Sequence, residues 1–222
     1  MPTPSAQPSE ASPVGFNIAA ITLALALCGL ALAYAIDAAS RRNRHPPHRL
    51  NEETTLTRTI GNRELEIPLS WFRYAEQRVE GFAKQIDLQF LVPLGENGAE
   101  RSVEVTLLPR SRARPSSRLL DGVYLHQFLR EEVSGPPGLV GKPLANRDGF
   151  ENETVWYDPL SADPFVAKCS SPVTQQAEPR CLRTVYLGSS IAAVYTFSAD
   201  VLANWRDFDT QLKPWLETIG AY

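Results

Sequence analysis

Five arginines crowd one stretch in the middle of the chain, between a predicted strand and a predicted helix. They are Arg101, Arg110, Arg112, Arg114 and Arg118. A guanidinium presents its N–H donors in a planar fork, which suits phosphate and carboxylate partners. The last four of these arginines are therefore candidates for binding an anion or a partner. A run of like charges is also typical of a solvated loop, and both interpretations stay open.

Two of the three cysteines are candidates for a disulfide. Cys169 and Cys181 lie twelve positions apart, at the ends of two neighbouring predicted strands. An antiparallel return between these strands would bring their Cα atoms within the ~4.4–6.8 Å that a disulfide requires. Such a bond persists in oxidising compartments, so it would place the domain in the periplasm. Two separate thiols are the alternative, and no further Cys or His completes a four-ligand zinc site.

The remaining residues give little support for catalysis. His126 is the only histidine beyond residue 49, and it falls on a predicted amphipathic helix, where a surface position explains it better than a role as a base. No Gly-x-Ser-x-Gly elbow, phosphate loop, dinucleotide fingerprint or His-Glu-x-x-His pair occurs. Asp158 and Asp163 adjoin prolines, where turn formation explains them. We expect no catalytic residue, no cofactor and no metal, with an enzyme of unrecognised site as an alternative.

A long apolar run precedes all of these residues. Val14–Ile36 holds 23 residues without Asp, Glu, Lys, Arg or His, and as a helix with a rise of 1.5 Å per residue it would span a ~30 Å hydrocarbon core. A cleaved signal peptide needs a basic segment before a shorter apolar stretch, and no Lys or Arg precedes residue 14. We expect an uncleaved, single-pass signal anchor in the inner membrane, with the lipid bilayer as its partner.

The segments around this run differ in composition. Residues 1–13 are rich in Pro and Ser, which predicts a disordered tail. Residues 37–54 include four arginines and a Pro-Pro pair, as in a basic juxtamembrane linker. Residues 55–222 are long enough for one soluble domain with its own core. Because basic residues follow the run and none precede it, the positive-inside rule places this domain in the cytoplasm, in conflict with the cysteine pair.

The charge of the domain limits its partners. Residues 50–222 hold 18 of the 22 Lys and Arg residues and 23 of the 25 Asp and Glu residues, which gives a net charge of about −5. Nucleic-acid binding relies on a basic surface that displaces counterions. We therefore expect no nucleic-acid partner.

Hydrophobic periodicity predicts an α+β domain with a mainly antiparallel sheet. Residues 55–68 read as a β-hairpin around Gly61-Asn62. Period-two alternation predicts strands, and helical spacing predicts a mid-chain helix over 119–133 and a C-terminal amphipathic helix over about 200–219. The strands are expected at residues 85–92, 102–108, 153–160, 164–169, 181–187 and 191–197. We expect the apolar stripe of the last helix to pack in the core of the domain.

Several of these segments also carry a resemblance. These segments follow one another along the chain in a fixed order: IGNRELEIPLSWFRYAEQR, an Ile-Asp-Leu strand that runs to Pro93, DPFVAKC with a second Cys, a Tyr-x-Phe strand and LANWRDFD. In this order they resemble an uncharacterised family of membrane-anchored alphaproteobacterial proteins. The resemblance implies a domain that faces the envelope, and no catalytic activity. The expected function is non-enzymatic binding or scaffolding of a membrane or periplasmic partner, with a hydrolase-like enzyme or a cytoplasmic-facing adaptor as alternatives.

Overall fold

A computed structural model of the chain describes residues 13–42, 54–147, 152–171 and 178–222. The expected tail over residues 1–13 lies almost wholly outside these ranges, as does most of the expected linker over 37–54. The chain forms two compact units, residues 1–45 and 46–222.

The first unit contains one helix, α1, which runs from Pro13 to Arg42. Its side chains are described at Ile18 and over residues 20–35, and these are exposed. Among the residues that the structure describes, no helix combines the length and the apolarity needed to cross a membrane. The span expected over residues 14–36 is therefore not found there, although a helix does form over it.

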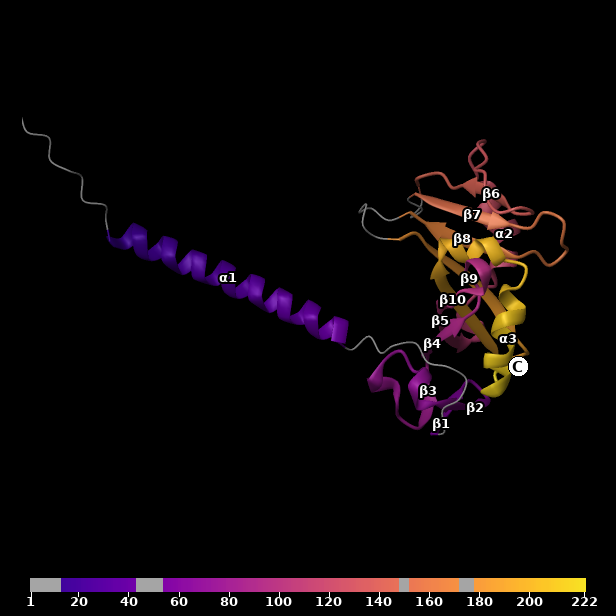
Figure 1. Cartoon of the computed structure of the whole chain (residues 1–222), viewed down its shortest axis with the longest axis horizontal. Helices are drawn as coiled ribbons and strands as arrows, with labels where there is room; N and C mark the ends of the chain where they lie inside the picture. Colours follow the sequence, from indigo (N-terminus) through magenta and orange to yellow (C-terminus); the bar gives the residue numbers. More distant parts are fainter. Residues whose placement is uncertain (1–12, 43–53, 148–151, 172–177) are drawn as a thin grey trace, which may run out of the picture. The chain divides into compact units, whose positions relative to one another are not determined.

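The second unit is built around a sheet of seven strands in which all neighbouring pairs are antiparallel (Figure 1). The strands follow the order β4-β5-β10-β9-β8-β7-β6. This arrangement confirms the expected antiparallel sheet of an α+β domain. The strands are β4 (Ile86–Val92), β5 (Arg101–Pro109), β6 (Val140–Pro143), β7 (Glu153–Tyr157), β8 (Val166–Ser170), β9 (Arg180–Leu187) and β10 (Ile191–Ser198).

A smaller sheet precedes the large one along the chain. Strands β1 (Thr55–Ile60) and β2 (Arg63–Pro68) form the expected hairpin, and β3 (Gly81–Ala83) joins β1 in parallel. Gly61 sits at the turn with a φ of 61°. Positive φ is strained for residues with a Cβ, which explains glycine at this turn.

The mid-chain helix is shorter than expected. Helix α2 covers Ser116–Gly122 and a 3₁₀ turn follows at Tyr124–His126, whereas the spacing predicted a helix over 119–133. Beyond this turn the chain pairs with β6 and the residue after it, through bridges from Val133 to Gly141 and from Phe128 to Leu144. Tertiary pairing therefore overrides the helical periodicity in this segment.

The C-terminal helix forms as expected but begins later. A 3₁₀ helix spans Ala199–Asn204, and helix α3 spans Phe208–Thr218. The apolar stripe of this segment packs in the core, as predicted. The ring of Trp215 stacks on Phe90 of β4 at a centroid distance of 5.0 Å, and the ring of Phe208 lies 4.6 Å from that of Phe197 on β10.

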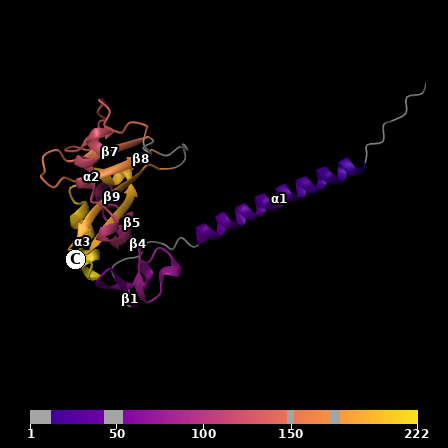
Figure 2. The same cartoon turned by 180° about the vertical axis from the view of Figure 1, so that it is seen from behind.

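The two helices cover opposite faces of the sheet. Val155 and Val166 pack with α2 in a small apolar cluster, whereas Trp156 and Ala167, their neighbours along β7 and β8, belong to the main core with α3. Successive side chains of a strand point to opposite faces, so α2 and α3 lie on different sides of these strands. The views in Figure 1 and Figure 2 show this part of the sheet from opposite sides.

A disulfide joins Cys169 of β8 to Cys181 of β9, as the spacing of these residues predicted. The two residues are direct partners in the register of the antiparallel pair. The bond therefore ties the two strands together at the point where they are paired.

Candidate anion-binding groove

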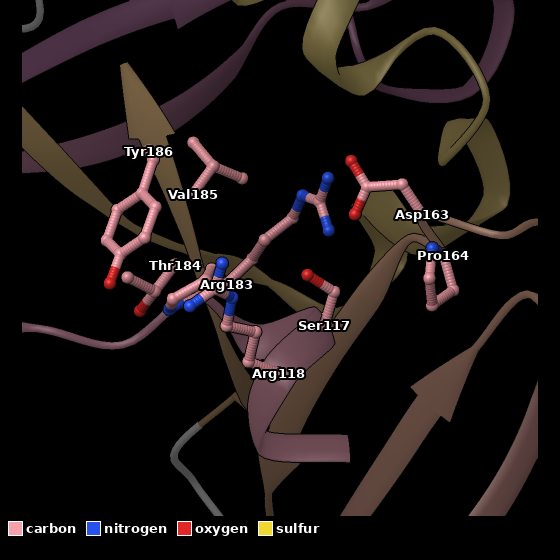
Figure 3. A pocket seen from close by; sticks show the side chains of 9 residues that line it. Ser117, Arg118, Asp163, Pro164, Arg183, Thr184, Val185 and Tyr186 are labelled. Carbon is pink, nitrogen blue, oxygen red and sulfur yellow. The ribbon is translucent and has the colours of Figure 1, made fainter. Parts of the chain in front are cut away.

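A groove opens where two neighbouring strands of the large sheet diverge. All eight residues of β9 pair with β10, but only Arg180, Cys181 and Leu182 pair with β8. Beyond Leu182 the chain that leads into β8 separates from β9 and leaves a cavity of about 250 Å³. Figure 3 shows the side chains around it. The cavity is lined by Pro115, Ser117, Arg118, Asp163, Pro164, Arg183, Thr184, Val185 and Tyr186.

The start of α2 is held against β9 by a buried hydrogen bond. The backbone N–H of Thr184 donates to Ser116 Oγ at 2.8 Å. Ser116 thus anchors the helix to the strand and places the next two residues, Ser117 and Arg118, on the groove wall. Helix α2 begins at Ser116 after Pro115, without a side-chain cap.

Arg183 borders the groove as one half of an ion pair. Its side chain is 9% exposed, and its Nη2 donates to Asp209 Oδ2 of α3 at 2.7 Å. A second bond runs from Nε to Asp209 Oδ1 at 3.3 Å, and the guanidinium lies 4.5 Å from the ring centroid of Phe165. Asp209 neutralises most of the charge of Arg183. Arg183 therefore gives the groove hydrogen-bond donors with little net charge.

Tyr186 forms another part of the wall and is held from two sides. Its hydroxyl donates to the backbone O of Ala113 at 3.2 Å. The guanidinium of Arg110 lies 4.0 Å from the centroid of its ring. A cation over an aromatic face is attracted by the ring quadrupole, so Arg110 helps to fix the ring without lining the cavity.

The structure does not gather the four predicted arginines into one site. Arg118 alone lines the groove, whereas Arg110 stacks on Tyr186. Arg112 points elsewhere, since its Nη1 donates to the backbone O of Lys84 at 3.0 Å. Arg114 is exposed. Within the part of the chain that the structure describes, neither Arg114 nor Arg118 forms an ion pair.

Arg118 gives the groove its available positive charge. Among the described residues no carboxylate pairs with its exposed guanidinium, and the Ser117 hydroxyl beside it faces the same space (Figure 3). Asp163 lies on the opposite wall and places one carboxylate across from these donors. Such walls suit a ligand that carries an anionic group toward Arg118 and N–H donors toward Asp163.

Most of the groove residues carry no signal in the sequence that predicts a site. Arg183, Thr184 and Tyr186 read as ordinary members of an alternating strand. Alternation assigns the face of a strand on which a side chain lies, but it does not show where the neighbouring strand departs. Asp163 was noticed, but only as part of a turn.

Groups with shifted pKa values lie away from the groove. Burial, with a smaller contribution from Glu153, raises the pKa of Tyr124 to about 12. Burial likewise raises the pKa of Tyr195 well above its usual value. Both shifts follow from packing of a phenol in an apolar interior. His126 is exposed on its 3₁₀ turn and does not line the groove.

The described residues contain no cluster of possible metal ligands. Across residues 13–42, 54–147, 152–171 and 178–222, no three His, Cys, Asp or Glu side chains gather closely enough to hold an ion. The groove itself contributes one carboxylate, from Asp163. The polar side chains on its walls can offer charge and hydrogen bonds to a ligand.

Comparison with known proteins yields no matching family model, no matching curated protein and no matching solved structure. The resemblance to a membrane-anchored alphaproteobacterial family therefore stays a prediction.

Proposed function

We propose that this chain is a non-enzymatic binding protein, tethered to a bacterial inner membrane by its N-terminal helix. Its folded unit lies on the periplasmic side and holds an anionic group of a membrane or periplasmic partner in the groove beside Arg118. The observation that carries the binding role is the guanidinium of Arg118. It borders a cavity of about 250 Å³ beside the Ser117 hydroxyl, and no carboxylate among the described residues pairs with it.

The tether is supported by the sequence of the first unit. Val14–Ile36 has 23 residues without a charged side chain or a histidine, and α1 covers all of them as helix. Apolar side chains such as Leu25 and Leu30 are exposed on this helix. In water such a surface is costly, and a lipid environment relieves that cost.

The periplasmic side is supported by the cysteines. The Cys169–Cys181 disulfide is of a kind that persists in oxidising compartments and is rare in the cytosol. The positive-inside rule is statistical and favours the opposite side. We give the disulfide more weight because it depends on a specific pairing of two side chains.

Titration calorimetry of the full chain in detergent tests the binding role, with inorganic phosphate and acetate as probes. Arg118→Gln removes the cation, whereas Arg112→Gln is a matched control because Arg112 binds the Lys84 carbonyl outside the groove. A hydrogen bond between charged groups contributes about 1.5–3 kcal/mol. We expect Arg118→Gln to weaken binding of at least one anion by about tenfold or more, and Arg112→Gln to leave it unchanged. Equal affinities in all three proteins would contradict the binding role.

A further inference from the structure

The outer edge of β9 has no strand partner beyond Leu182, and at Thr184 its N–H is bonded to Ser116 at the start of α2. Pairing with β8 stops at Leu182, while pairing with β10 continues to Leu187. The second half of β9 therefore has a sheet partner on one side and the groove on the other. Unpaired strand edges are sites at which another extended chain adds to a sheet.

The hydrogen bond to Ser116 shows which backbone groups face this edge. The N–H of Thr184 donates to Ser116 Oγ, so it points away from β10. In an antiparallel pair the N–H and C=O of one residue point to the same side, and residues two apart point the same way. The Thr184 carbonyl and both backbone groups of Tyr186 therefore face the groove. Apart from bonds within the sheet, no described residue forms a hydrogen bond with any of these three backbone groups.

The groove is closed at one end. Lys168 pairs with Leu182, and the disulfide between Cys169 and Cys181 follows directly. A chain that enters along β9 cannot continue past this point, because β8 already occupies the edge. A chain terminus fits such a dead end better than the middle of a strand.

The size and charge of the cavity also favour a chain terminus as the ligand. Its volume of about 250 Å³ lies just below the roughly 300–1,000 Å³ of pockets for drug-sized ligands. Only the tip of a longer molecule enters such a space. Ser117 and Arg118 follow directly after Ser116, which is bonded to Thr184, so their donors lie close to the closed end.

We propose that the groove binds the extended C-terminal end of a partner polypeptide, which adds to the edge of β9 that β8 leaves unpaired and ends at the Ser116 contact. The terminal carboxylate lies at Arg118 and Ser117. The last peptide groups exchange hydrogen bonds with the Thr184 carbonyl and with the N–H and C=O of Tyr186. Asp163, on the other wall, accepts from donors on the far side of the ligand chain. This inference rests on the proposed function, since it names the ligand of the same groove.

Binding of short peptides to the full chain in detergent tests this inference. The probe is a pool of N-acetylated tetrapeptides with the last two positions randomised, prepared as free acids. A second pool carries C-terminal amides, and a third carries an N-methyl group on the last peptide bond. Amidation removes the carboxylate, while N-methylation removes a backbone donor and leaves the charge intact. We expect the free-acid pool to bind, and the amidated and N-methylated pools to bind at least tenfold more weakly.

The outcomes separate this inference from the proposed function. Binding of the free-acid pool that is lost in Arg118→Gln and kept in Arg112→Gln supports both. Two results would overturn strand addition: N-methylation that has no effect on peptide binding, or a free-acid pool that does not bind. If phosphate or acetate still binds through Arg118 in either case, the anion groove stands. If the amidated pool binds as tightly as the free acids, the terminal carboxylate is overturned. If neither anions nor peptides bind, both proposals fail.

Discussion

Cys169 and Cys181 face each other directly across β8 and β9, and their disulfide lies at the closed end of the groove. The bond closes a loop with a sequence separation of 12 residues. It also covalently links the residue pair next to Lys168 and Leu182, the last pair before the two strands diverge. The position of the groove therefore depends on a cross-strand contact as well as on backbone hydrogen bonds.

Removing the disulfide should destabilise the folded unit. On the chain-entropy model, closing a loop of this length stabilises the fold by about 3 kcal/mol. We expect the double variant Cys169→Ala, Cys181→Ala to lose about 2–3 kcal/mol in urea unfolding of the full chain in detergent. Cys28→Ala is the control, because Cys28 is a free, exposed cysteine of α1. A double variant as stable as the control would show that the bond contributes nothing to folding.

The compartment of the folded unit can be read from two reporters. A C-terminal alkaline phosphatase fusion should be active, and a C-terminal fluorescent protein that matures only in the cytoplasm should be dark. Alkylation of the denatured native protein should reach Cys169 and Cys181 only after reduction, because the disulfide protects them. Bright fluorescence with both cysteines alkylated before reduction would place the unit in the cytoplasm and favour an adaptor facing that side.

Two neighbouring arginines should differ in their contribution to stability. Arg110 stacks on Tyr186 and its Nη1 donates to the Gly188 carbonyl at 3.4 Å, whereas Arg114 is exposed. We expect Arg110→Ser to cost about 0.5–1 kcal/mol through the lost cation–π contact. Arg114→Ser should change the free energy of unfolding by less than about 0.5 kcal/mol. Thermal and urea unfolding of both variants checks this, and equal losses would argue against a structural role for the stacked ring.

The ion pair of Arg101 and Asp200 should make stability depend on pH in the acid range. Partial burial of Asp200 opposes its ionisation, but hydrogen bonds from Ser198 and Arg101 and the charge of Arg101 outweigh it, so the pKa of Asp200 is lowered. A carboxylate with a lowered pKa stabilises the fold above its ordinary value of 3.8. That stabilisation is lost as the pH falls through the folded-state value.

Asp200→Asn tests this dependence. The native chain should be more stable than the variant at neutral pH, and the difference should shrink to nothing well below pH 3.8. The pair is solvent-exposed, with its Nε–Oδ2 distance at 2.6 Å, so added salt should also reduce the difference. Asp121→Asn, at an exposed position of α2, is the control. A difference that stays constant with pH would mean that the Asp200 charge does not stabilise the fold.

Much of the fold follows from local pattern. The alternation in β4 and β5, the Gly-Asn turn and the apolar stripe of α3 each depend on neighbours a few residues away, and each forms as expected. The segment 123–133 does not. Its apolar residues have helical spacing, but Phe128 and Val133 gain more by pairing with β6, a partner that lies outside any local window.

The groove is harder to predict from a single sequence than the fold is. Arg118 was predictable as a candidate for anion binding, because its type and its place in an arginine-rich segment are local properties. The roles of Arg183 and Tyr186 depend on where β8 leaves β9, which is a matter of register between segments. A disulfide was predictable from two strand ends, but its place at the closed end of a groove was not.

Site-resolved NMR of the isotope-labelled full chain in detergent tests the central claim most directly, with inorganic phosphate as the titrant. We expect saturable shifts of the Ser117 and Tyr186 amides and of the Arg118 side chain, because these residues line the same cavity. These shifts should disappear in Arg118→Gln and persist in Arg112→Gln. Shifts that fall elsewhere, or that are the same in native protein and Arg118→Gln, would contradict the claim that this groove holds an anionic group.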